Sequence, residues 1–61
     1  MEWHKVKGVW VTEDYAYKIR KIHDLQHKNK YLWESAFQGK VLFVSWTLRE
    51  AKKCCYEHSV S

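Results

Sequence analysis

Two alternating segments on either side of Gln38–Gly39 decide more about this fold than any other part of the sequence. Tyr31, Trp33 and Phe37 fall at alternate positions before the dipeptide, and an apolar run within Lys40–Trp46 follows it. Because glycine accepts the positive φ that a two-residue hairpin turn requires, we expect the segments to pair as antiparallel strands. Both faces of the second segment are largely apolar, which predicts either a central place in the sheet or a place partly between the sheet and a helix.

A helix is predicted directly after this strand. Thr47–Leu48–Arg49–Glu50 matches a capping box, in which the Thr47 hydroxyl accepts a hydrogen bond from the backbone N–H of Glu50. About a dozen residues of helix are marginal alone, so the helix must lay its apolar stripe on the sheet. That stripe, at helical spacing, is Leu48, Ala51, Cys55 and His58.

The first half of the chain also predicts strands. Trp3–Val11 is rich in β-branched and aromatic residues and predicts one strand, with Gly8 as a bulge or bend inside it. A turn at 12–14 and a polar loop at 23–30 flank a second strand at 15–22. In that strand one face is expected to carry Tyr15, Tyr17 and Ile19, and the other Lys18 and Arg20.

The 61-residue chain contains two glycines and no proline, so no linker divides it. We predict a single α+β domain over residues 1–61, with a three- to four-stranded antiparallel sheet packed against one C-terminal helix. A chain this short buries only about 60% of the surface of its unfolded form, which leaves no volume for a cofactor cleft. Binding is therefore predicted rather than catalysis, with no enzyme activity.

Cysteines and histidines predict neither a disulfide nor a metal site. Cys54 and Cys55 are adjacent, where a bridge would be strained and would close no useful loop, so a cytoplasmic location with free thiols is expected. His23 and His27, like Cys54 and His58, are four residues apart, but their order matches no zinc finger. No secretory signal and no membrane span are expected, and no cofactor.

Positive charge is concentrated in one window. The net charge is +4, and five basic residues against Asp24 in the window 18–30 account for all of it. Such a patch favours an acidic partner, and phosphate contacts from lysine and arginine supply much of the affinity for nucleic acid. The predicted DNA-binding residues are Lys18, Arg20, Lys21, Lys28 and Lys30. Aromatic residues that interleave with them would suit base stacking if they face solvent, namely Tyr15, Tyr17, Tyr31 and Trp33.

A protein partner is the alternative. One short helix cannot cover every aromatic ring of such a sheet, and uncovered rings are typical of interface centres. A host protein or a second copy of the chain would then bind the exposed rings. The candidate interface residues are Trp3, Trp10, Trp33 and Trp46.

The chain resembles small bacteriophage and prophage accessory proteins. Ala16–Arg20, Tyr31–Trp33, Gly39 and Thr47–Lys52 running to His58 carry the resemblance, which spans residues 15 to 58. Those proteins place a short antiparallel sheet before a helix, and several bind a host or defence protein. The order of elements is also similar to the arm-type DNA-binding domains of integrases, which read DNA with a three-stranded sheet. The resemblance implies a non-catalytic binding protein.

Overall fold

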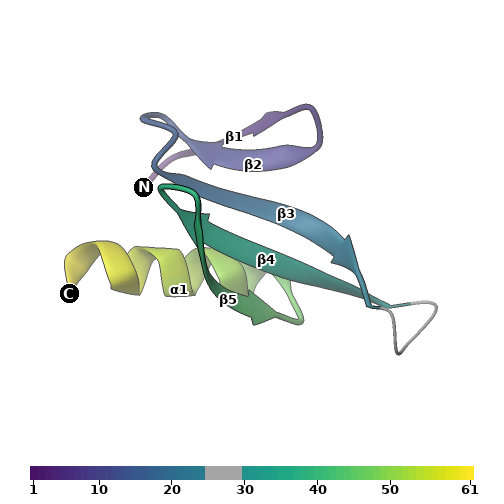
Figure 1. Cartoon of the computed structure of the whole chain (residues 1–61). Helices are drawn as coiled ribbons and strands as arrows, with labels where there is room; N and C mark the ends of the chain where they lie inside the picture. The colour runs from purple at the N-terminus through teal and green to yellow at the C-terminus, as the bar shows by residue number, and fades with distance from the viewer. Residues whose placement is uncertain (25–29) are drawn as a thin grey trace.

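The computed structural model describes residues 1–24 and 30–61 (Figure 1). A single sheet has the order β1-β2-β3-β4-β5 with every neighbouring pair antiparallel, and one helix follows it. The elements are β1 (Trp3–Val6), β2 (Val9–Thr12), β3 (Tyr17–His23), β4 (Tyr31–Phe37), β5 (Lys40–Ser45) and α1 (Leu48–Val60). The predicted α+β class is confirmed, but the sheet has five strands, not three or four.

The additional strand results from a turn at Lys7–Gly8. We predicted one strand with a bulge at Gly8, but the segment folds as the β1–β2 hairpin. Lys7 and Gly8 have φ of 51° and 83°, as Gln38 and Gly39 have 49° and 85°, so both dipeptides form the primed turn of tight hairpins. The Gln38–Gly39 prediction is confirmed, and the same residue-then-glycine signature was present at Lys7–Gly8.

The turn before β3 is closed by a short polar network. Asp14 Oδ1 accepts from the Thr12 hydroxyl at 2.8 Å and from the Ala16 N–H at 3.0 Å. These bonds, more than any other factor, lower the pKa of Asp14. Tyr15 has φ of 59° and lies in this turn, not on the strand face where we expected it.

The helix begins where the capping box predicts. Thr47 is the N-cap, and its Oγ1 accepts from the Glu50 N–H at 3.1 Å. Ala51 and Cys55 are fully buried, and Leu48 packs against the same core, as the predicted stripe requires. Within residues 1–24 and 30–61, no helix is long and apolar enough to cross a membrane.

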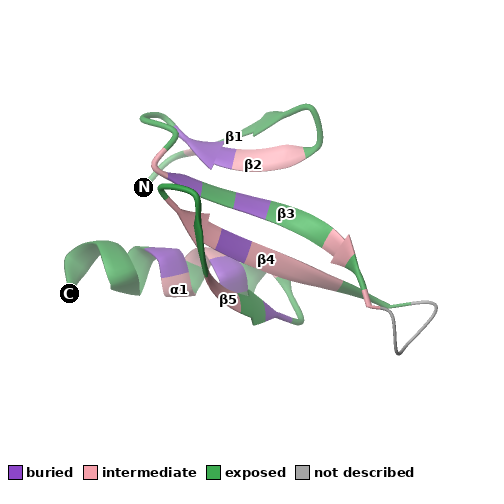
Figure 2. Cartoon of the chain, in the orientation of Figure 1, coloured by how far each residue is buried: buried purple, intermediate pink, exposed green. Residues whose placement is uncertain are grey.

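The helix covers one face of β3, β4 and β5, which we call the helix-side face (Figure 1). Tyr17 and Ile19 lie there with 6% and 0% of their surface exposed, and alternate residues of β3 are exposed on the other, open face (Figure 2). Strand register carries this division across the sheet, because Ile19 pairs with both Trp10 and Ser35. The core cluster therefore lies between sheet and helix, whereas Val11, the partner of Lys18, is buried on the open face of β2.

β5 is an edge strand and not a central one, and the helix contacts it on one face. A bulge also changes its faces. Ser35 pairs with Phe43 and Ala36 pairs with Val41, so Leu42 is an extra residue in the ladder. Leu42 and Phe43 both pack against the core. The alternation that we expected along β5 is therefore interrupted, and Val41 and Val44 lie together on the open face, 58% and 47% exposed.

Candidate nucleic-acid interface

The predicted basic residues do not share one surface. Lys18 and Arg20 lie on the open face, whereas Lys21 lies on the helix-side face, because successive side chains of a strand point to opposite faces. Lys30 directly precedes β4, and Lys28 lies outside the described residues. The continuous ribbon of charge expected from the sequence is thus divided between two faces.

Arg20 is paired with an acid. Its Nε donates to Glu34 Oε1 at 2.8 Å across the β3–β4 ladder, where the two residues are direct partners. The Arg20 side chain is 61% exposed and that of Glu34 18%. The pair neutralises part of the positive charge on the open face, which leaves that face less suited to a polyanion than its lysine and arginine content indicates.

Aromatic rings and ammonium groups meet instead where β3 ends at His23 and β4 begins at Tyr31, which we call the far end of these two strands. The Lys21 Nζ lies 4.1 Å from the centroid of the Tyr31 ring and 5.8 Å from that of Trp33. Lys21 pairs with Trp33, and His23 pairs with Tyr31, so these side chains share the helix-side face. The His23 and Tyr31 rings are 5.4 Å apart. Tyr31 is half exposed, so its ring is accessible.

Lys30 and Trp46 form a second lysine–ring pair at the same end of the sheet. Alternation places this pair toward the open face, because Lys30 adjoins Tyr31 and Trp46 adjoins Ser45, and both of those neighbours are on the helix-side face. The Lys30 Nζ lies 5.8 Å from the ring centroid of Trp46, which is 58% exposed. The Asp24 N–H donates to the Lys30 carbonyl at 3.1 Å, which ties the start of β4 to the end of β3. We call the five residues that alternate charge and ring here the far-end cluster: Lys21, Lys30, Tyr31, Trp33 and Trp46.

Strand lengths explain why Tyr31 at this end is uncovered. The last residue of β5, Ser45, pairs with Trp33, so β3 and β4 continue past the end of β5 toward His23 and Tyr31. The helix starts after β5 and runs back toward the other end of the sheet, where His58 contacts Tyr17 (Figure 1). The far end of the β3–β4 ribbon therefore projects beyond its cover.

Most of the tryptophans predicted as a protein interface are partly buried in the core. Trp3, Trp10 and Trp33 are half-buried and pack against the core, so among the four candidate tryptophans Trp46 is the exposed one. Trp10 lies between Lys52, 4.3 Å from its ring centroid, and Lys5, at 5.8 Å. The contact with Lys52 ties the β1–β2 hairpin to the helix.

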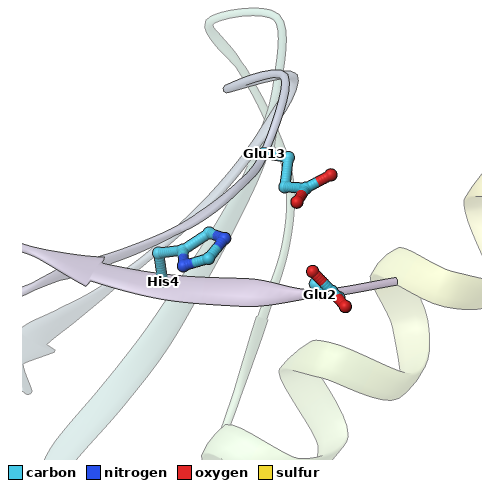
Figure 3. Close-up of side chains that lie close together, drawn as sticks. All are labelled: Glu2, His4 and Glu13. Atoms are coloured by element: carbon cyan, nitrogen blue, oxygen red, sulfur yellow. The ribbon is translucent and has the colours of Figure 1, made fainter.

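A group of possible metal ligands lies on the β1–β2 hairpin. Donor atoms of Glu2, His4 and Glu13 lie within 4.8 Å of one another, on the same side of the hairpin (Figure 3). Ligands around one bound zinc ion are separated by about 3.4 Å, and the three side chains are exposed. The group as it stands is too open to define a metal centre. His23 and His58 lie toward opposite ends of the sheet, which does not bring together the zinc ligands considered above.

Catalytic chemistry has little support in the described residues. Both cysteines are free, and burial is the largest cause of the raised pKa of Cys55, which keeps its thiol protonated and unreactive. An open hollow of about 420 Å³ beside the Asp14 turn is lined partly by Glu2, Tyr17 and Tyr56, and it lies away from the far-end cluster. The prediction that the protein is not an enzyme stays a prediction.

Sequence reasoning identified all the members of the far-end cluster separately and missed their grouping. Lys21 and Lys30 were predicted as phosphate contacts, Trp33 and Trp46 as a protein interface, and Tyr31 as a stacking residue. Alternation from Ile19 to Lys21, and the pairing of β3 with β4, were the signals that place Lys21, Tyr31 and Trp33 on one face. Of the other predicted stacking rings, Tyr17 is buried.

Comparisons with known proteins add no relative. No protein-family model matches the chain, and no curated protein and no solved structure matches it at a significant level. The resemblance to phage accessory proteins and to integrase arm-type domains stays a prediction.

Proposed function

We propose that the protein binds single-stranded DNA through the far-end cluster. The observation that carries the proposal is the Lys21 ammonium 4.1 Å from the half-exposed Tyr31 ring, with Trp33 beside them. Stacking surfaces next to phosphate-binding cations are the two components that single-stranded nucleic-acid sites combine. The cluster supplies both on one projecting ribbon.

Stacking would be provided by Tyr31 and Trp46, the rings of the cluster that are 50% and 58% exposed. A base that stacks on such a ring contributes about 1–3 kcal/mol and is accepted whatever its identity, because every base has an aromatic face. Unpaired bases can reach these rings, whereas the bases of a duplex are already stacked on each other. A preference for single strands over duplex follows.

Phosphates would be bound by Lys21 and Lys30. Both lysines lie within 6 Å of an aromatic ring of the cluster, and Lys21 is the closer, 4.1 Å from the Tyr31 ring centroid. A lysine that rests on an exposed ring has a long flexible side chain, so its ammonium can turn to a phosphate while a base takes the ring. Each phosphate neutralised on a single strand contributes about 0.7 to the slope of log affinity against log salt.

The test is a fluorescence-anisotropy titration of labelled oligo(dT) at several salt concentrations, with a DNA duplex and an oligo(U) strand as comparison ligands. Removing two lysines in Lys21→Ala/Lys30→Ala should lower the salt slope by about 1.4. Tyr31→Ala/Trp46→Ala should weaken binding at least tenfold with the slope unchanged, because stacking is lost and charge is not.

The matched control is Lys18→Ala/Lys40→Ala, which removes the same charge from exposed positions outside the cluster. This control should bind oligo(dT) nearly as wild type does. An equal loss of affinity in both double-lysine variants would mean that net charge alone attracts DNA. Wild-type affinity in Tyr31→Ala/Trp46→Ala would contradict the proposed site.

A further inference from the structure

The open face of the sheet carries apolar side chains that no element of the described chain covers. The helix contacts β3, β4 and β5 only from the other side. The strand register places Ala36 beside Val41 and Ile22 beside Leu32, with Val44 adjoining Glu34. Val41 and Val44 are about half exposed. From this face we propose that two copies of the chain associate through their open faces, with each sheet covering the other.

The surface area of the chain supports this association. Its accessible surface is 4800 Å², whereas a compact monomer of 7.5 kDa is expected to expose about 4,200 Å². The excess is several hundred Å², comparable to the roughly 800 Å² that each partner contributes to a stable interface. A sheet covered on one face only contributes to this excess, together with the end of β3 and β4 that projects beyond the helix, and a second sheet would reduce it.

Charge selects a second copy as the occupant of the face. Arg20 and Glu34 lie side by side near its centre, and Arg20 uses its Nε alone on Glu34 Oε1. Within residues 1–24 and 30–61, this is the one contact between the two side chains, and the guanidinium has four further N–H donors and the carboxylate a second oxygen with which to bind another group. A two-fold axis between the two residues brings Arg20 of each copy to Glu34 of the other. Lys18, also on this face, can extend its ammonium to the periphery.

Pairing through the outer edge of β5 is less favourable. Lys40 begins this edge strand, and the bulge at Leu42 interrupts its ladder, two features that hinder the addition of another strand. The face is thus the better surface for association. In the resulting dimer Lys21, Tyr31 and Trp33 lie on the outer, helix-side faces. The inference uses no residue of the far-end cluster, so it does not depend on DNA binding.

The test is the mass of the purified protein, without nucleic acid, by light scattering and sedimentation over a range of concentrations. Wild type should approach about 15 kDa, twice the 7.5 kDa of the chain, at micromolar to millimolar concentration. Val44→Asp should lower the association constant at least tenfold. Val60→Asp adds the same charge to an exposed residue of the helix and should associate as wild type does.

A charge-reversal series distinguishes loss of the interface from loss of the fold. Arg20→Glu should give a folded monomer, judged by far-ultraviolet circular dichroism, and Arg20→Glu/Glu34→Arg should restore the dimer because the pairing is reciprocal. A wild-type mass of 7.5 kDa at every concentration would overturn the inference. A dimer that persists unchanged in Val44→Asp and Arg20→Glu would also overturn it, since association would then use another surface.

Discussion

The two ends of the β3–β4 ribbon carry similar aromatic residues in different environments. At one end Tyr17 and Phe37 are partners in the ladder, their ring centroids are 4.7 Å apart, and His58 from the helix closes over both. At the other end Tyr31 meets Lys21 and is half exposed, while Trp33, near the same ammonium, is half-buried against the core. The comparison teaches that alternation decides which face a ring occupies, while the helix decides whether the ring becomes core or surface.

Polar chemistry follows the same division. The Tyr17 hydroxyl forms a 2.7 Å hydrogen bond with His58 Nδ1, and burial is the largest cause of its raised pKa. A buried hydroxyl needs such a partner, because leaving it unpaired would cost about 1–3 kcal/mol. Tyr31 has solvent within reach and needs no such arrangement, which leaves its ring and the neighbouring ammonium available to a ligand.

The largest expected difference between the two ends is in stability. Tyr17→Ala should destabilise the protein by about 3–5 kcal/mol, since it leaves a cavity under the helix, whereas Tyr31→Ala should cost less than about 1 kcal/mol. Urea unfolding followed by circular dichroism measures both. If Tyr17→Ala fails to fold, Tyr17→Phe should still cost about 1 kcal/mol through the lost bond to His58. Equal costs for the two alanine variants would contradict the division into core and surface ends.

The helix cap gives a smaller effect. Thr47→Ala removes the acceptor for the Glu50 N–H and should cost about 1 kcal/mol, because the first turn of the covering helix loses its partner. Ser59→Ala, near the other helix end, is the control and should stay within about 0.5 kcal/mol in the same unfolding assay. If Thr47→Ala left the free energy of unfolding unchanged, the helix would not depend on the Thr47 cap.

The turn at Asp14 gives the smallest effect, and it depends on pH. Hydrogen bonds from Ala16 and Thr12 lower the folded-state pKa of Asp14 below its ordinary value of 3.8. Its stabilising contribution is therefore present above the unfolded-state pKa and is lost as the pH falls through the lower folded-state pKa. Asp14→Asn should flatten the acid decline of stability below about pH 4, whereas Glu13→Gln should change that decline less. Identical acid profiles for wild type and Asp14→Asn would contradict the network.

Local signals in the sequence predicted local structure well. The Gln38–Gly39 turn and the Thr47 cap each depend on a few neighbouring residues, and both are confirmed. The Lys7–Gly8 hairpin was missed because β-branched residues on both sides of the glycine also fit one long strand. The bulge at Leu42 has no comparable sequence signature, since it follows from how two strands pair.

The candidate site could be predicted only in pieces for a related reason. Alternation along β3 places Lys21 and Lys18 on opposite faces of the sheet, and this can be predicted from the sequence. The exposure of Tyr31 does not, because it depends on where β5 ends and on the direction in which the helix returns, which are non-local properties. The Arg20–Glu34 pair likewise requires the register of β3 and β4.

The central claim is that DNA meets the uncovered end of the β3–β4 ribbon, and the four tryptophan indole N–H signals test it directly. In a nitrogen–proton correlation spectrum titrated with oligo(dT), the signals of Trp33 and Trp46 should shift, together with the Lys21 and Tyr31 amides. Those of Trp3 and Trp10, packed on the first hairpin, should stay in place. No shift at saturating oligonucleotide, or shifts centred on Lys18 and Arg20 of the open face, would contradict the account.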